Sequence, residues 1–208
     1  MTKSHREIYD ILSTLHSNAQ CELNFTTPFE LLVAVILSAQ CTDKRVNIVT
    51  EKLFKIASTP EDFVRMPLEE LEEHIKPCGF YHNKAKSLKE MAKSVLELGA
   101  VPEDREELMK LSGVGRKTAN VVSAVAFGKN AIAVDTHVFR VSNRLGIASG
   151  DTPEQVEEQL MAKFDEEIWS KLHHYILFHG RYVCKAQKPN CTDCPLKNRC
   201  KYYKNTKI

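Results

Sequence analysis

The stretch that most constrains this fold is residues 111–118, with the sequence LSGVGRKT. Its two glycines, Gly113 and Gly115, follow one helical pattern and open another. Because glycine permits positive φ and close backbone approach, the pattern predicts a tight hairpin between two helices. Amides of such a hairpin and of the next helical turn lack intrahelical partners, so with the helix dipole they make a phosphate site. Lys117 falls in that turn, where the dipole disfavours a cation, which indicates an amine kept for chemistry.

The same stretch differs from the phosphate loop of nucleotide triphosphatases. That motif, G-x-x-x-x-G-K-[ST], requires a glycine directly before the lysine. Here Arg116 stands between Gly115 and Lys117, and Lys110 occupies the position of the first glycine. The pattern therefore argues against a nucleotide triphosphatase.

The size and composition fit a globular protein. The chain has 208 residues, 43% of them hydrophobic, which allows one domain or two modest ones with a real core. The longest apolar run, Leu31–Leu37, is far shorter than the ~18 residues that span a bilayer. Polar residues soon follow the basic N-terminus, so no secretory signal is predicted. We expect a cytoplasmic, nucleoid-associated protein.

The charge is unevenly distributed although the net charge is only +2. Residues 181–208 carry eight Lys and Arg residues and one acid, Asp193, whereas the other 180 residues carry 21 basic and 26 acidic ones. A basic C-terminal segment on an acidic body fits a polyanion-binding edge. From charge alone, a solvated basic tail fits equally well.

The sequence pattern is helical almost throughout. A capping Thr, a Pro and an acid or amide three residues after the Thr recur at residues 27–30, 59–62 and 152–155. The run Leu31–Leu37 fits a buried strand by periodicity, but the preceding cap favours a buried helix. Further helices are predicted over residues 83–98, before the stop at Gly99, and over 116–127 and 154–164.

Strand signals are weak. Ala131–Val134 is the one short candidate, and it is too brief to found a sheet. The sequence therefore predicts an all-α fold. No linker composition divides the chain, so domain boundaries do not follow from composition.

The chain has seven cysteines, and four of them cluster near the C-terminus. These four are Cys184, Cys191, Cys194 and Cys200, spaced C-x6-C-x2-C-x5-C. Clustered thiols in a cytosolic chain favour metal binding over disulfides. Four thiolates can bind tetrahedral zinc or a [4Fe–4S] cluster, and the spacing alone leaves both open. The scattered Cys21, Cys41 and Cys78 are interpreted as ordinary small residues.

Together the hairpin and the cysteine spacing resemble the endonuclease III branch of the helix-hairpin-helix DNA glycosylases. The hairpin in that family carries L-P-G-V-G-R-K-T-A-like residues, and this chain differs mainly at Ser112, where Pro is common. The cysteine spacing is the family's iron–sulfur signature, which implies one [4Fe–4S] cluster on the four clustered cysteines. The resemblance extends from Leu23 to Cys200.

The resemblance implies a two-lobed fold and an activity. A six-helix domain containing the hairpin would span Glu22–Ile132. A second helical domain, Met1–Cys21 with Ala133–Ile208, would carry the cluster. The family's activity is that of a base excision repair glycosylase that removes oxidised pyrimidines from duplex DNA and is also an abasic-site lyase. We expect the protein to act on DNA as a monomer.

Two residues match the catalytic pair of that family. Lys117 would attack C1′ of a deoxyribose and expel the damaged base, and the resulting imine would allow β-elimination on the 3′ side. Asp135, eighteen residues later in a V-D-T-H context, would accept protons or stabilise the cationic sugar. By its position Asp135 is also the expected N-cap of a helix that runs through Arg144. Capping and catalysis are compatible.

Other residues match the DNA contacts of the family. An enzyme that flips a base must fill the vacated stack and contact the orphaned base. Gln40, in the segment SAQCTD, resembles the gap-filling glutamine, and Phe80 falls where the family inserts a Leu. Without the family, Phe80 would be assigned to packing. Cys41 departs from the small apolar residue expected beside Gln40.

The hairpin and the segment that carries the four clustered cysteines, residues 184–200, complete the expected DNA surface. We call this segment the cysteine segment. The hairpin residues expected to hold the DNA backbone are Gly113, Val114, Gly115 and Arg116. His137, beside Asp135, would contact the flipped nucleotide or a phosphate. The basic residues among the cysteines would contact phosphates without sequence preference; they are Lys185, Lys188, Lys197, Arg199 and Lys201. A structural role is assigned to His179-Gly180-Arg181.

Two alternative functions remain open at this stage. An adenine- or mismatch-specific glycosylase of the same fold also carries the cluster, but that branch usually lacks the hairpin lysine and has a further C-terminal domain. A non-catalytic, metal-bound DNA-binding module would bind DNA without cleaving it. The presence of both Lys117 and Asp135 argues against such a module, because a phosphate clamp does not need the carboxylate.

Overall fold

The protein is helical, as a computed structural model that describes residues 1–206 shows. No strand occurs within these residues, so the all-α prediction is confirmed and Ala131–Val134 is irregular backbone. The chain divides into two compact units. We call Glu22–Lys129 the hairpin unit and Met1–Cys21 with Asn130–Ile208 the cysteine unit.

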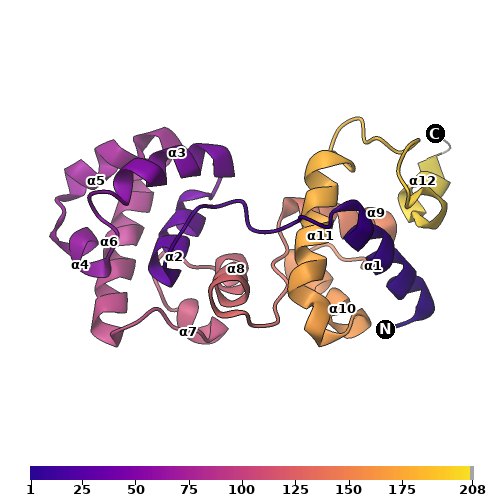
Figure 1. The fold of residues 1–208 in the computed structure, drawn as a ribbon, viewed down its shortest axis with the longest axis horizontal. Helices are drawn as coiled ribbons and strands as arrows, with labels where there is room; N and C mark the ends of the chain where they lie inside the picture. The colour runs from indigo at the N-terminus through magenta and orange to yellow at the C-terminus, as the bar shows by residue number, and fades with distance from the viewer. Residues whose placement is uncertain (207–208) are drawn as a thin grey trace. The chain divides into compact units, whose positions relative to one another are not determined.

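The hairpin unit is built around a central helix (Figure 1), and the residues of this helix are buried. Its helices are α2 (Pro28–Leu37), α3 (Asp43–Leu53), α4 (Pro60–Arg65), α5 (Leu68–Ile75), the 3₁₀ turn η1 (Lys76–Cys78), α6 (Tyr81–Leu98), α7 (Arg105–Leu108) and α8 (Arg116–Phe127). Every residue of α2 from Phe29 to Leu37 is buried. α8, α6 and α3 pack against α2, while α4 and α5 pack against α6. The apolar run is therefore a buried helix, as its cap indicated.

The predicted helix starts are confirmed, because each depends on a local hydrogen bond. Thr27 Oγ1 accepts from the Glu30 amide at 3.1 Å, and Thr152 does the same for Gln155 at 3.3 Å. Thr59 forms the complete reciprocal capping box with Asp62. Such caps are each worth about 1 kcal/mol. They therefore set where α2, α4 and α10 begin.

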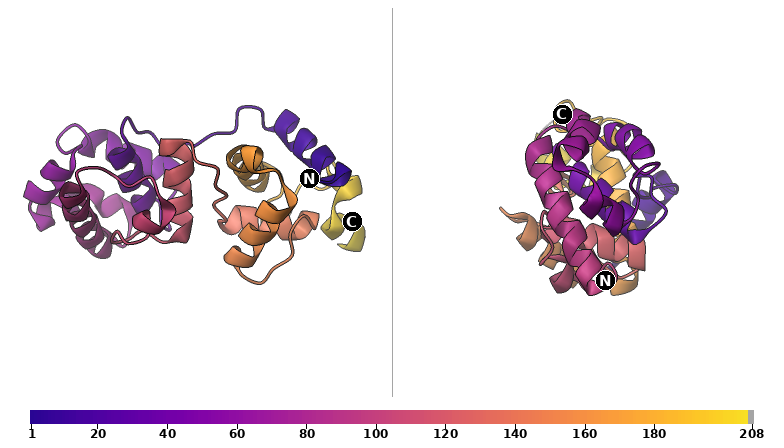
Figure 2. Two further views of the ribbon diagram at one scale, coloured as in Figure 1. Left: turned by 90° about the horizontal axis from the view of Figure 1, so that it is seen from below. Right: turned by 90° about the vertical axis from the view of Figure 1, so that its left-hand side faces the viewer.

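The cysteine unit joins the two ends of the described chain. It contains α1 (Lys3–Leu15), α9 (Thr136–Leu145), α10 (Pro153–Lys163), η2 (Glu166–Ile168), α11 (Trp169–Tyr182), η3 (Lys197–Arg199) and α12 (Lys201–Thr206). α11 packs against α9 and α1, and α12 packs against α9. Figure 2 shows α1 and α12 within this same unit. Its core includes Leu12, Val138, Val141, Leu172 and Ile176, all of them buried.

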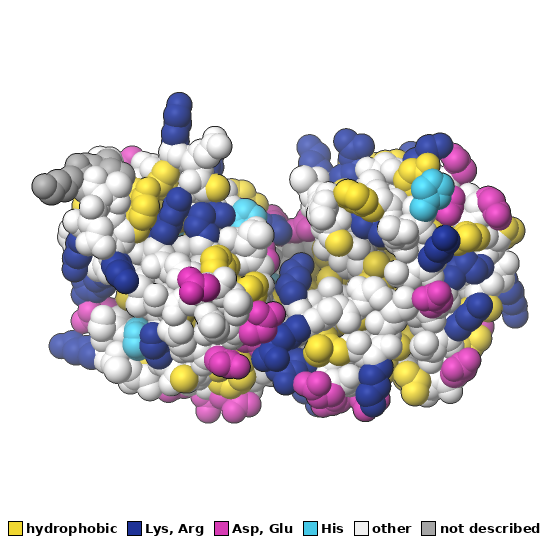
Figure 3. All heavy atoms as spheres, turned by 180° about the vertical axis from the view of Figure 1, so that it is seen from behind, with side chains coloured by type: hydrophobic (Ala, Val, Ile, Leu, Met, Phe, Trp, Pro, Cys, Tyr) yellow, Lys and Arg dark blue, Asp and Glu magenta, His cyan; other side chains and the backbone are white. Residues whose placement is uncertain are grey.

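The surface carries charges of both signs. Figure 3 shows Lys and Arg side chains mixed with Asp and Glu on the visible face of each unit. This mixture agrees with the small net charge of +2. Within the described part of the chain, no helix is both long enough and apolar enough to cross a membrane.

Candidate active site and metal centre

The hairpin predicted from residues 111–118 connects α7 to α8. Gly113 has φ +77°, in the left-handed region that glycine adopts without strain. A Cβ at Gly113 would lie 3.0 Å from Cβ of Ser87 on α6, closer than ordinary contact. The Val114 amide closes the turn by donating to the Leu111 carbonyl at 3.1 Å. Both the backbone conformation and the packing therefore require glycine at this position.

The start of α8 offers a place for an anion. Gly115 is its N-cap, and no side chain caps this end of the helix. A phosphate oxygen can take the place of the missing cap, where the helix dipole also favours it. Lys117 lies in the first turn and is exposed. Ser112, at the position where the resemblance expects Pro, donates from Oγ to Glu90 Oε2 on α6 at 2.8 Å and so ties the hairpin to that helix.

Gln40 and Phe80 share a rare backbone conformation. Their φ angles are +54° and +50°, in the left-handed region that non-glycine residues seldom adopt. Both side chains are exposed, and Phe80 is 66% exposed although it is a large apolar residue. This exposure excludes burial of Phe80 in the core, which is the assignment that it would receive without the family resemblance. Both residues are presented to whatever binds this surface of the hairpin unit.

Asp135 is the N-cap of α9, as its position predicted. Its Oδ1 accepts from the amides of His137 at 2.9 Å and of Val138 at 2.8 Å. Both bonds of the cap end on the same oxygen, so the cap does not use Oδ2. His137 Nδ1 lies 3.3 Å from Nη2 of Arg140, one turn further along α9. The cap thus orients the carboxylate and leaves part of it available for other contacts.

Arg140 is a site residue that the sequence analysis missed. Its Nη2 donates to the Gly180 carbonyl at 2.9 Å, and its Nε donates to the Cys184 carbonyl at 3.1 Å. Arg140, in the second turn of α9, therefore joins this helix to the end of α11 and to the start of the cysteine segment. Burial lowers the pKa of Arg140, and Asp135 acts in the opposite direction. The available signal was its spacing, one turn after His137 and one turn before Arg144.

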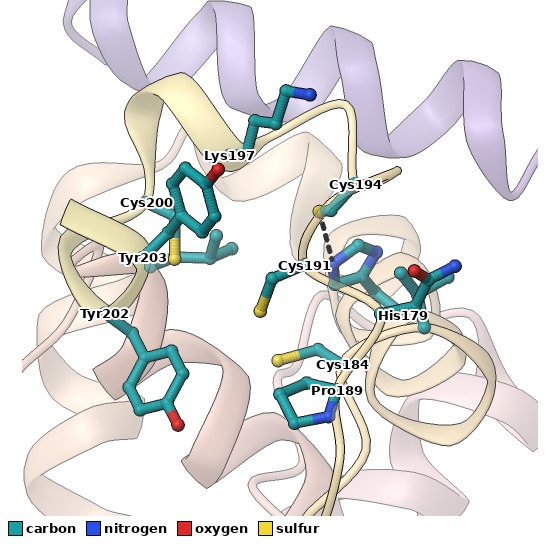
Figure 4. A pocket seen from close by; sticks show the side chains of 12 residues that line it. His179, Cys184, Pro189, Cys191, Cys194, Lys197, Cys200, Tyr202 and Tyr203 are labelled. Carbon is teal, nitrogen blue, oxygen red and sulfur yellow. Dashed lines mark hydrogen bonds between the residues drawn. The ribbon is translucent and has the colours of Figure 1, made fainter. Parts of the chain in front are cut away.

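The four clustered cysteines line one pocket of the cysteine unit (Figure 4). Cys184 follows α11, Cys191 and Cys194 lie in the irregular segment after it, and Cys200 precedes α12. The pocket has about 330 Å³ of empty space, its open mouth included. Within residues 1–206, no three His, Cys, Asp or Glu side chains lie close enough to hold one metal ion. The sulfurs therefore surround a space rather than a single point.

Groups around the sulfurs can stabilise charge on them. Arg144 Nη1 lies 3.5 Å from Cys184 Sγ, and His179 Nε2 lies 3.6 Å from Cys194 Sγ. Burial raises the pKa of the Cys191 and Cys194 thiols, and burial lowers the pKa of His179 to about 4. Partly buried thiols such as these ionise more readily next to a cation, and a metal supplies one. The donor set is suited to a metal group.

Arg144 also holds the cysteine segment to α9. Its guanidinium donates to the carbonyls of Lys185 at 2.7 Å and Ala186 at 3.0 Å. The same guanidinium lies 4.6 Å from the ring centre of Tyr202, close enough for a cation–π contact. These contacts attach both ends of the cysteine segment to one helix.

Some basic residues of the cysteine segment make contacts within the cysteine unit, and others are exposed to solvent. Arg199 forms an ion pair with Glu7 of α1, and Lys197 Nζ donates to the Thr192 carbonyl at 2.7 Å. Both are therefore engaged within the cysteine unit. The side chains of Lys185, Lys188 and Lys201 are exposed.

The comparisons with known proteins agree with one another. Residues 33–166 match the model of the HhH-GPD superfamily base excision DNA repair proteins. Endonuclease III of Bacillus subtilis (strain 168) is 54% identical over 195 residues, which cover 92% of this chain and 89% of the relative. Endonuclease III of Escherichia coli (strain K12) is 46% identical and is covered in full, as is this chain. The chain belongs to the endonuclease III family.

Solved structures of endonuclease III have the same fold. A trapped covalent endonuclease III–DNA intermediate, an estranged-adenine complex, matches with a TM-score of 0.95, 49% identity and full coverage of both chains. A non-covalent endonuclease III–DNA complex matches with a TM-score of 0.93, 50% identity and 98% coverage of both. A thermostable thymine-DNA glycosylase at 27% identity has a TM-score of 0.81 over 97% of both chains.

Proposed function

We propose that this chain removes oxidised pyrimidines from duplex DNA and then cleaves the strand at the resulting abasic site, as a bifunctional DNA glycosylase and lyase of base excision repair. The observation that carries the proposal is the hairpin, which places an exposed lysine, Lys117, in the first turn of a helix without a side-chain cap. The existence of a trapped covalent endonuclease III–DNA structure at 49% identity supports a covalent mechanism for this family.

Lys117 is the proposed nucleophile. Its neutral Nζ attacks C1′, the bond from C1′ to the base breaks, and the base leaves with its electron pair and takes up a proton. Opening of the sugar ring then gives an imine between Nζ and C1′. Loss of a proton from C2′ expels the phosphate oxygen at C3′, which breaks the strand. Water hydrolyses the imine and restores the lysine.

Asp135 is the proposed partner in these steps. Its carboxylate stabilises the positive charge on the sugar as the base departs, and it can then accept a proton. The two N–H groups that cap α9 hold the carboxylate in one orientation.

The proposed DNA contacts follow from the local geometry. Amides of the hairpin bind a backbone phosphate at the start of α8; these residues are Gly113, Val114, Gly115 and Arg116. Gln40 and Phe80 enter the space that the flipped nucleotide leaves, since both are exposed. His137 contacts the flipped nucleotide or its phosphate.

We further propose that the two units are the functional domains. The family resemblance placed the first boundary after Ile132, whereas the hairpin unit ends at Lys129. Both locations lie in the irregular segment between α8 and α9. The hairpin unit would then be the six-helix domain of the family, with the four-residue α7 as an additional short turn.

The four cysteines are proposed to hold one [4Fe–4S] cluster. A single zinc ion would bring all four sulfurs to about 2.3 Å from one point. The sulfurs instead line a wider pocket, which fits a larger group (Figure 4). When bound, the cluster cross-links Cys184, Cys191, Cys194 and Cys200 and so holds the basic segment in shape. The exposed Lys185, Lys188 and Lys201 can then meet DNA phosphates.

The relatives do not favour the two alternative functions. Identity of 54% to an endonuclease III over most of the chain argues against an adenine-specific enzyme and against a silent binding module. We propose that the enzyme works as a monomer in the cytoplasm, in association with the nucleoid where its substrate lies.

Borohydride trapping tests the proposal directly. Wild-type protein and a Lys117→Ala variant are incubated with a duplex that contains one abasic site and are then reduced. Lys110→Ala is the matched control, because Lys110 is an exposed lysine just before the same hairpin. We expect a covalent band for wild type and control and none for Lys117→Ala. No band from folded wild type would refute the lyase, and a band from Lys117→Ala would refute the choice of nucleophile.

A further inference from the structure

Lys84 is a buried lysine on the first full turn of α6, and the proposed mechanism does not use it. It is 7% exposed. Its Nζ donates to the carbonyls of Leu37 at 2.8 Å, Ala39 at 2.8 Å and Cys78 at 3.0 Å. An ammonium group has three N–H donors, and these three carbonyls use all of them. Lys84 is therefore a fully satisfied buried cation held by backbone alone.

The three carbonyls belong to two loops that are far apart in the sequence. Leu37 ends α2, and Ala39 directly precedes Gln40. Cys78 ends η1 and lies two residues before Phe80. Carbonyls at helix ends carry partial negative charge, which a cation stabilises. One ammonium group thus joins the loop of Gln40 to the loop of Phe80.

The two residues beside these carbonyls need such support. Gln40 and Phe80 both have the left-handed backbone conformation, which costs free energy for any residue with a Cβ. A strained residue keeps its conformation only where its surroundings determine it. The neighbouring carbonyls that Lys84 holds are part of those surroundings.

We propose that Lys84 is a positioning residue that ties the two loops together, so that Gln40 and Phe80 enter the DNA stack as one unit. This inference rests on the proposed roles of Gln40 and Phe80 in base flipping. Lys84 itself does not touch DNA, because its ammonium is buried and its three donors are occupied. The same occupancy excludes it as a second nucleophile.

Other groups near Lys84 do not replace the carbonyls. The thiols of Cys41 and Cys78 are the ionisable groups that interact with it. Burial raises the pKa of Cys78 to about 11, so this thiol is neutral at physiological pH. Burial lowers the pKa of Lys84, and the three carbonyls are the groups that its ammonium contacts directly.

Lys89 provides a matched control on the same helix. Its Nζ also donates to two backbone carbonyls, those of Val64 at 3.1 Å and of Met66. These carbonyls lie at the end of α4 and not in the loops of Gln40 and Phe80. Lys89→Met therefore removes the same kind of interaction and leaves the proposed tie intact.

Amide hydrogen exchange of the free protein tests whether Lys84 ties the two loops together, and it needs no measurement of activity. The amides of Cys41 and Gly79 each close a turn in one of the two loops, at 3.0 Å and 3.2 Å. We expect Lys84→Met to speed exchange of both amides by at least about tenfold, and Lys89→Met to speed neither. Unchanged exchange in Lys84→Met, or faster exchange of one amide alone, would overturn the tie.

An activity ratio then tests the link to DNA. Each protein is assayed for thymine glycol removal from a duplex and for borohydride trapping on a single strand with one abasic site, where no base stack must be filled. Lys84→Met should lose at least about tenfold on the duplex relative to the single strand, since a misplacement of about 1 Å can cost 10²-fold. An unchanged ratio would overturn the positioning role. Absence of trapping in wild type would refute the lyase, and the exchange data would still decide the tie.

A second variant and the wild type itself cover the case in which Lys84→Met does not fold. Lys84→Gln keeps two N–H donors, so it should show smaller changes of the same kind. In wild-type protein, the amides of Cys41 and Gly79 should show matched protection factors under conditions that favour local opening, because one contact protects both. Clearly different protection factors for these two amides would contradict the proposal.

Discussion

Substituting alanine at Gly180 tests how the cysteine unit positions Asp135. Gly180 lies in α11, where α9 comes very close. A Cβ added there would lie 2.8 Å from Cβ and 3.3 Å from Cα of His137, and 3.1 Å from Cγ2 of Val141. The atoms at His137 belong to or adjoin the backbone, so they cannot rotate away. In Gly180→Ala the first turn of α9 must therefore move, and Asp135 is the N-cap of that turn.

The expected size of the effect combines two opposing terms. Overpacking of one methyl group in a close-packed contact costs about 1–3 kcal/mol. Alanine in place of glycine within a helix returns up to about 1 kcal/mol. We therefore expect Gly180→Ala to lower the free energy of unfolding by about 1–2 kcal/mol. Because the shifted turn carries Asp135 and His137, we also expect base removal to slow by at least about tenfold.

Gly150→Ala is the control for this experiment. A Cβ at Gly150 would also meet another Cβ at 2.8 Å, that of Gln155, in the same unit. The Gly150 amide donates a hydrogen bond to Oδ1 of Asn143, which lies near the opposite end of α9 from Asp135. Urea unfolding followed by circular dichroism and single-turnover removal of thymine glycol are measured for both variants. Gly150→Ala should lose stability and keep its excision rate. A Gly180→Ala variant that is as stable and as active as wild type would refute the reasoning.

Three further predictions concern charge, metal and pH. Asp135→Asn should leave the free energy of unfolding within about 0.5 kcal/mol of wild type, because Asn caps helices as well as Asp. The rate of base removal should fall by at least about 100-fold. If the free energy of unfolding fell as much as the activation free energy rose, Asp135 would act as a cap alone. Cys194→Ser should lose iron and the visible absorbance near ~400 nm, whereas a colourless, zinc-containing wild type would contradict the cluster. Burial lowers the pKa of His174 from its ordinary 6.5, and Arg181 acts in the same direction. Below about pH 6.5 the folded state then binds fewer protons than the unfolded state, so the free energy of unfolding decreases as the pH is lowered. His174→Gln should make this decrease smaller, as measured by urea unfolding between about pH 7.5 and 5.

Local chemistry explains which parts of the fold followed from the sequence. The starts of α2, α4 and α10 depend on a Thr and on an amide three residues later, so the signal and the structure involve the same residues. The predicted helix over residues 116–127 matches α8 for the same reason, since a glycine lies just before it and another just after it. Gly113 was also recognisable, because a positive φ in a tight turn requires glycine.

Contacts between distant segments explain what the sequence could not provide. Arg140 acts on carbonyls about forty residues away, and no local pattern encodes that pairing. Lys84 and Lys117 are both lysines near the N-terminus of a helix, yet only Lys117 is proposed to be a nucleophile. Burial separates the two: Lys117 is exposed, whereas Lys84 is 7% exposed and bonded to three carbonyls. Position in a helix therefore does not by itself distinguish a chemical amine from a structural one.

The strained residues of the described chain provide independent support for several of the proposed DNA contacts. Within residues 1–206, the non-glycine residues with positive φ are Gln40, Phe80 and Lys188. Each such residue costs about 1–2 kcal/mol, which a glycine at the same position would avoid. A sequence shaped by stability alone would not keep three such side chains on exposed positions. All three lie in segments that we propose to meet DNA, and we infer that contacts with DNA are the reason that side chains are kept at these strained positions.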